Sequence, residues 1–213
     1  MKKIKRVSAK DQVLSTIRKE IFNGSLHSGQ EITQEEIASL LGVSRMPVRE
    51  AFEVLDREGL LRIESTRRVT VVGLKYEEIH IHYEIRSLLE GLAASHAAAN
   101  TAYHKQLEKI HQELYNSSSK QDKQPYVEIN KQFHQTIWEA SNSVKLTSML
   151  NDLWNGLQPQ LPALVTGQTE ASINDHRRVL EAILDRDGEK AREYMQVHII
   201  SSRDSFIENF ENK

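Results

Sequence analysis

One stretch decides the fold of the N-terminal part of this chain: residues 37–52, IASLLGVSRMPVREAF. Apolar residues recur with helical spacing on both sides of Gly42, which predicts two short helices separated by a tight turn. Thr33 and Glu36 form a capping box before the first helix, while Ser44 and Pro47 suit the first turn of the second. Two short helices joined in this way are typical of a helix-turn-helix motif.

The flanking sequence completes a small domain. Upstream, apolar residues with helical spacing follow Ser8 and stop at Asn23-Gly24, which predicts a further helix. In the helix that follows Thr33, the side chains of Ile37, Leu40 and Leu41 are expected to point inward. Downstream of Gly59, the runs 60–63 and 69–72 favour two β-strands that form a hairpin, with residues 64–68 at its tip. Three helices and a hairpin predict a winged helix-turn-helix.

This geometry indicates contacts with DNA. Arg45 and Arg49 lie one turn apart at the start of the third helix, where an arginine can reach guanine O6/N7 or a phosphate in the major groove. Ser44 and the helix N-terminus favour a phosphate, and arginines at the wing can reach the backbone or the minor groove. The alternative is that these arginines form a solvated face. The candidate DNA-binding residues are Ser44, Arg45, Met46, Pro47, Arg49, Thr66, Arg67 and Arg68.

Composition supports a two-part chain. The 213 residues carry a net charge of −2, but residues 1–75 hold 14 Lys+Arg against 10 Asp+Glu, and the rest is acidic. A basic head on an acidic body is typical of a nucleic-acid-binding module attached to another domain. The absence of cysteine excludes disulfides, thiol catalysis and cysteine-ligated metal sites. No apolar run suits a membrane helix or a signal peptide, so a cytoplasmic location is expected.

Residues 76–213 are predicted to be all-α. The expected domains are therefore 1–73, the winged helix-turn-helix, and 76–213, a helical bundle. Helical periodicity breaks at polar or proline-containing loops and at Asp185-Arg186-Asp187-Gly188. The expected helices span 76–99, 101–115, 125–140, 143–157, 170–184 and 189–206.

Three of these helices each carry a histidine on their apolar face. His134 lies in the apolar stripe of 125–140, one turn after Asn130, and His176 and His198 lie on the buried faces of the last two helices. A buried neutral imidazole needs partners for both nitrogens, and a shared divalent cation can provide them. Imidazoles with an oxygen ligand suit zinc first, and also nickel, manganese or iron. The alternative is that each histidine is a hydrogen-bonded core residue.

The N-terminal motif resembles a known family. Residues 37–52, followed by Glu58-Gly59-Leu60, are similar to the DNA-binding signature of GntR-family bacterial transcription regulators. That family usually has threonine where Met46 stands and a glycine near the wing tip where Arg68 stands. The resemblance implies binding to double-stranded operator DNA as a homodimer.

The C-terminal part resembles the FCD effector-binding domain of the FadR-type branch. Its matching pieces are residues 83–90, Asn130 to His134, Asp175-His176-Arg177, and Asp187-Gly188 through His198. The resemblance implies a divalent-metal site made of Asn130, His134, His176 and His198. It also implies that Arg86 receives the carboxylate of a small effector. A salt bridge from Arg86 to Glu90 or Glu84 on the same helix is the alternative.

The sequence therefore predicts a transcription regulator, a repressor in most of that family, whose operator affinity is modulated by a small organic acid bound near a metal. Two alternatives are a metal-dependent hydrolase or lyase and a metal-free regulator that responds to acyl-CoA. A regulator that senses the metal itself is a third. No general base lies on the Asn130/His134 face, which disfavours an enzyme.

Overall fold

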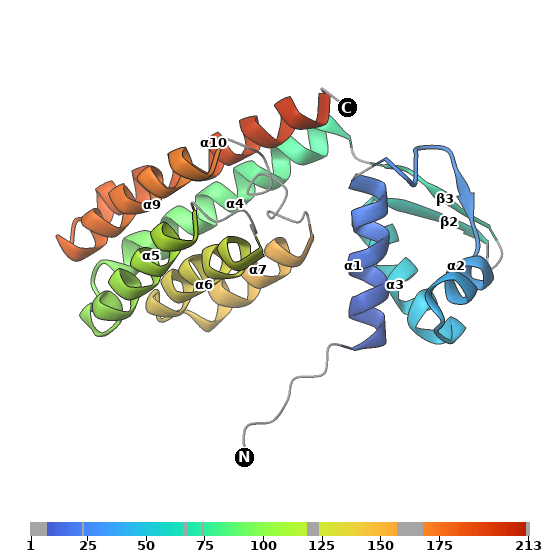
Figure 1. Ribbon diagram of the computed structural model, residues 1–213, viewed down its shortest axis with the longest axis horizontal. Helices are drawn as coiled ribbons and strands as arrows, with labels where there is room; N and C mark the ends of the chain where they lie inside the picture. Colours follow the sequence, from blue (N-terminus) through green and yellow to red (C-terminus); the bar gives the residue numbers. More distant parts are fainter. Residues whose placement is uncertain are drawn as a thin grey trace, which may run out of the picture. The chain divides into compact units, whose positions relative to one another are not determined.

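The computed structural model describes residues 8–22, 24–65, 68–73, 75–118, 124–156 and 168–211. The chain divides into two compact units, Met1–Lys75 and Tyr76–Lys213 (Figure 1). The fold class is mainly α, with a winged helix-turn-helix followed by an all-α bundle, which confirms the predicted class.

The first unit consists of three helices and a small sheet. Its elements are α1 (Ala9–Phe22), β1 (Glu31–Ile32), α2 (Gln34–Leu41), α3 (Arg45–Arg57), β2 (Leu61–Ser65) and β3 (Arg68–Val71). The sheet is antiparallel with strand order β1-β3-β2. The α3 helix packs on α1, α2 and β2 around a core that includes Ile17, Phe52 and Leu55.

Local chemistry explains the turn between α2 and α3. Thr33 and Glu36 form the predicted capping box at the start of α2. Gly42 ends this helix in the left-handed conformation, with a φ of 64°, which a glycine adopts without steric cost. Two details differ from the sequence prediction. Leu40 was expected to point inward, but its side chain is 79% exposed on the outer face of α2. The strand β1 was not predicted because a two-residue strand leaves no periodic signal.

The second unit is a helical bundle. Its elements are α4 (Tyr76–Ala97), the 3₁₀ turn η1 (Thr101–Tyr103), α5 (His104–Ser118), α6 (Gln124–Ala140), α7 (Val144–Gly156), α9 (Gln168–Leu184) and α10 (Gly188–Glu211). The α4 helix contacts α6, α7, α9 and α10, and it lies alongside α10 (Figure 1). The α5 helix packs on α6 and α9. Because α4 touches four other helices, side chains from all of them can meet in the interior of the bundle.

Gly91 permits the close approach of α4 and α10. A Cβ atom at this position would lie 2.7 Å from Gln196 Cγ and 3.2 Å from the carbonyl oxygen of Arg192 on α10. Because the contact with Arg192 involves the backbone, a larger residue would push the helices apart. This crossing adjoins Glu90, whose side chain is fully buried.

Candidate functional site

The first candidate surface is the N-terminal end of α3. Ser44 is the N-cap residue, but its hydroxyl makes no capping hydrogen bond among the described residues. Ser44, Arg45, Met46 and Arg49 are exposed, and Pro47 is half-buried in the first turn. The opposite face of the helix is buried in the core through residues such as Val48 and Phe52. The helix is therefore anchored on one side and presents two arginines on the other.

Both arginines have acidic neighbours in this structure. Arg45 forms an ion pair with Glu35 of α2 at 2.6 Å, and Arg49 lies 3.8 Å from Glu53 one turn further along α3. All four side chains are largely exposed, so each pair contributes about 0–1 kcal/mol. Such weak pairs can exchange for contacts with DNA phosphates or bases.

The wing is the β2–β3 hairpin. Arg68 is the exposed first residue of β3. Thr66 and Arg67, also proposed from the sequence as DNA contacts, lie outside the described residues.

The second candidate site is a cluster of three histidines in the bundle. His134 from α6, His176 from α9 and His198 from α10 are all buried, and one ligand nitrogen from each lies within 4.8 Å of the others. The Nε2 atoms of His134 and His176 are 3.2 Å apart. Two ligands of one tetrahedral zinc ion, each about 2.0 Å from it, would be about 3.3 Å apart. The spacing of this pair therefore suits a shared metal.

A carboxylate lies near the Nδ1 atom of two of the three imidazole rings. Glu90 Oε2 of α4 lies 2.5 Å from His134 Nδ1, which leaves Nε2 of that ring directed at His176. Asp175 Oδ2 is 3.6 Å from His198 Nδ1, which is too far for a hydrogen bond, and this nitrogen has no hydrogen-bond partner among the described residues. A carboxylate behind a histidine orients the ring and raises its basicity as a metal ligand.

Electrostatics favour neutral rings for His176 and His134 and an ionised side chain for Glu90. Burial, reinforced by His198 and His134, holds the pKa of His176 well below its ordinary value. Burial also lowers the pKa of His134, although Glu90 acts in the opposite direction. For Glu90, burial raises the pKa, but His134, Arg86 and the hydrogen bonds outweigh it and hold the pKa well below the usual range. A neutral imidazole is the form that binds metal.

The donor set fits a divalent metal. His176 Nδ1 and Asn130 Oδ1 are buried and have no hydrogen-bond partner among the described residues. Asn130 precedes His134 by one turn of α6, as the sequence predicted. The three imidazoles form a nitrogen-rich set that suits zinc or nickel.

Arg86 lies in the same interior. Its Nε donates to Glu90 Oε1 at 2.6 Å, so the salt-bridge alternative raised from the sequence describes its partner here. The guanidinium carbon is 4.6 Å from the ring centroid of Trp154 on α7. Because Glu90 also contacts His134, the salt bridge holds Arg86 beside the histidine cluster instead of on the surface.

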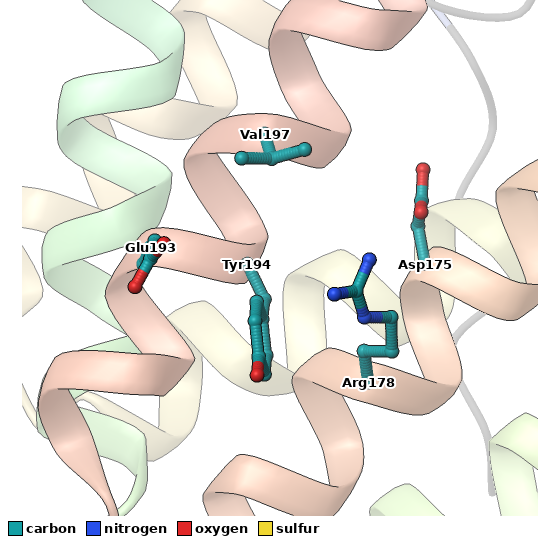
Figure 2. A pocket seen from close by; sticks show the side chains of 5 residues that line it. All are labelled: Asp175, Arg178, Glu193, Tyr194 and Val197. Carbon is teal, nitrogen blue, oxygen red and sulfur yellow. The ribbon is translucent and has the colours of Figure 1, made fainter.

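A small open pocket adjoins the cluster. Asp175 and Arg178 project into it from α9 (Figure 2). Its other lining residues, Glu193, Tyr194 and Val197, come from α10. The Arg178 guanidinium is 4.7 Å from the Tyr194 ring centroid, and Asp175 contacts both the pocket and His198.

Sequence reasoning missed four contributors to this site. Glu90 was considered only as a salt-bridge partner for Arg86 on the same helix, and Trp154 was given no role in this site. Trp138, which donates Nε1–H to Glu90, and Asp175 were not assigned a role. One available signal was the position of Glu90, one turn from Arg86 and directly before Gly91, Ala93 and Ala94, where small side chains indicate close packing.

Comparison with known proteins agrees with this architecture. Residues 9–71 match the model for bacterial regulatory proteins of the gntR family, and residues 81–201 match the FCD domain. The chain is 29% identical to a probable D-xylose utilization operon transcriptional repressor of Paenarthrobacter nicotinovorans, covering 93% of this chain and 88% of the relative. It is 26% identical to the HTH-type transcriptional regulator YdhC of Bacillus subtilis, covering 88% and 86%. The solved structure of McbR/YncC from E. coli superposes with a TM-score of 0.72 at 23% identity, covering 96% of this chain and all of that one.

The winged helix-turn-helix and the matched domains define a DNA-binding transcription regulator. The chain belongs to the GntR family and carries a C-terminal FCD domain. The relatives named above are transcription regulators, which confirms the predicted class of protein. None of the described helices is long and apolar enough to cross a membrane.

Proposed function

We propose that this protein is a repressor whose affinity for its operator is controlled by a small carboxylate bound beside a divalent metal in the bundle. The observation that carries the proposal is the buried cluster of His134, His176 and His198, joined to Arg86 through Glu90. A metal would supply a positive centre that polarises and holds an anion. Arg86 would add a planar donor that matches a carboxylate.

The metal ligands in this proposal are Asn130, His134, His176 and His198, with zinc as the first choice and nickel or manganese as alternatives. One relative named above is a probable repressor of a D-xylose utilization operon, which supports repression as the mode of action. Domain 1–73 would bind DNA, and domain 76–213 would bind the effector and dimerise.

Operator release by a carboxylate tests this function. Operator DNA would be selected from a random pool with the zinc-loaded full chain, and affinity would be followed by fluorescence anisotropy against a panel of small carboxylates. We expect at least one acid to lower operator affinity by about 5- to 150-fold, the usual range of coupling between two sites. The Arg86→Met variant should bind the operator but lose the response. A zinc-loaded protein that responds to no carboxylate, but releases DNA with acyl-CoA, would contradict the proposal.

The second proposed partner is another copy of the chain. Ile81, Ile85 and Leu88 recur at spacings of four and three residues on α4, so they share one face, and all three are exposed. An apolar stripe on an outer helix face suits a two-fold interface. A dimer would place two α3 helices in successive major grooves of a pseudo-palindromic operator.

Leu88→Lys is expected to break this dimer. A buried leucine contributes about 1.5–3 kcal/mol, and a two-fold interface contains it twice, so the dissociation constant should rise at least about 100-fold. Sedimentation velocity at several concentrations measures the change, with Glu108→Lys, an exposed position on α5, as the control. A Leu88→Lys protein that sediments as the wild type would exclude this face.

A further inference from the structure

Glu90 is a fully buried carboxylate that accepts hydrogen bonds from three different side chains. Its Oε1 accepts from Arg86 Nε at 2.6 Å. Its Oε2 accepts from His134 Nδ1 at 2.5 Å and from Trp138 Nε1 at 3.1 Å. An ionised carboxylate is only an acceptor, so all three neighbours act as donors. The buried carboxylate of Glu90 thus contacts both a proposed metal ligand, His134, and the proposed effector-binding residue, Arg86.

This division fixes the orientation of both groups. Donation from His134 Nδ1 selects the tautomer whose Nε2 lone pair is directed at His176. Donation from Arg86 Nε holds its guanidinium beside Trp154. Neither arrangement can change without a change in the bonds to Glu90.

We propose that Glu90 is a positioning residue that couples metal occupancy to anion recognition, an inference that rests on the proposed function. A cation on His134 Nε2 makes the Nδ1–H a stronger donor, which draws the carboxylate charge toward Oε2. The bond from Oε1 to Arg86 then weakens, and the arginine becomes available to an anionic ligand. By reciprocity, an anion on Arg86 releases Glu90 to His134 and strengthens metal binding.

The chain contains its own reporter of this network. It has two tryptophans in all, Trp138 and Trp154. Trp138 is bonded to Glu90, and Trp154 lies against Arg86 with its ring centroid 5.2 Å from that of His134. Intrinsic tryptophan fluorescence therefore reports on this site directly, without a label.

Glu90→Gln in the full chain tests the coupling. A glutamine keeps the size of the side chain but removes the charge and one acceptor. We expect zinc affinity to fall about 10- to 100-fold, the usual cost of losing the group behind a metal-bound histidine. In the zinc-free protein we expect the opposite change for succinate, used as the anionic probe: its affinity should rise, because Arg86 is no longer neutralised. Glu84→Gln, exposed on the same helix, controls for the lost charge.

The opposite changes expected in zinc affinity and succinate affinity distinguish a positioning role for Glu90 from a purely structural one. A loss of bundle stability would lower the affinities for zinc and for succinate together. That result, or no change in either affinity, would overturn the inference. If Glu90→Gln fails to fold, the Arg86→Met variant is measured instead. We expect this variant to bind zinc with unimpaired affinity but not to bind succinate. Impaired zinc affinity would contradict the inference. A wild-type chain that binds zinc but no succinate in either metal state would refute the proposed effector class, and the coupling with it. Succinate binding that Glu90→Gln leaves unchanged would refute the coupling alone.

Discussion

Arg49→Ala is expected to reduce operator affinity strongly while leaving the fold intact. Arg49 is exposed in the first turns of α3, and its ion pair with Glu53, at 3.8 Å, is weak because both side chains are exposed. An arginine that contacts a base contributes about 1–3 kcal/mol, which is roughly 5- to 150-fold for each half-site. Because a dimer reads two half-sites, the total loss would be larger still.

Anisotropy with selected operator DNA at several salt concentrations measures this loss. If Arg49 contacts a phosphate, the slope of log affinity against log salt should decrease by about 1 for each contact, and a base contact should leave it nearly unchanged. Arg57→Ala is the matched control, since Arg57 lies on the same helix in its last turn. Wild-type affinity in Arg49→Ala would refute the assignment of α3 as the recognition helix.

The double change His134→Ala/His176→Ala is expected to abolish zinc binding. Zinc sites in small domains have apparent binding free energies of about 10–16 kcal/mol at neutral pH, or roughly 3 kcal/mol for each of four ligands. Loss of two ligands should therefore weaken zinc binding about 10⁴-fold. The DNA-binding unit has its own core, so operator binding without effector should remain measurable.

Competition with a zinc-sensitive dye measures the affinity, and His96→Ala/His80→Ala serves as the control because both of those histidines are exposed on α4. Zinc affinity within a few-fold of the wild type in the double variant would show that the cluster is not the metal site.

Much of the fold was predictable because its signals are local. The capping box at Thr33, the left-handed Gly42 and the apolar face of α3 lie within a few residues of one another, and each specifies one element. Pro125 in the first turn of α6 and Asp187 before α10 mark helix starts in the same way. Leu40 shows the limit of this reasoning: Leu40 and Leu41 are adjacent, and periodicity alone does not decide which of the two faces outward.

The candidate site was predictable in part. His134, His176 and His198 could be assigned to apolar faces one helix at a time, and the structure brings their nitrogens within 4.8 Å. The role of Glu90 was not accessible in this way. This role depends on the packing of α4 against α6. There Glu90 contacts His134 and Trp138, which lie more than 40 positions further along the sequence. Such a contact is set by tertiary packing, which short-range patterns do not encode.

The metal content of the untagged chain, purified without chelators and quantified by elemental analysis, decides whether the histidine cluster is a metal site. We expect close to one equivalent of zinc, or of nickel or manganese, per chain. A protein that contains no metal and takes up none when zinc, nickel and manganese are added would contradict this expectation, and the three histidines would then be hydrogen-bonded residues of the core.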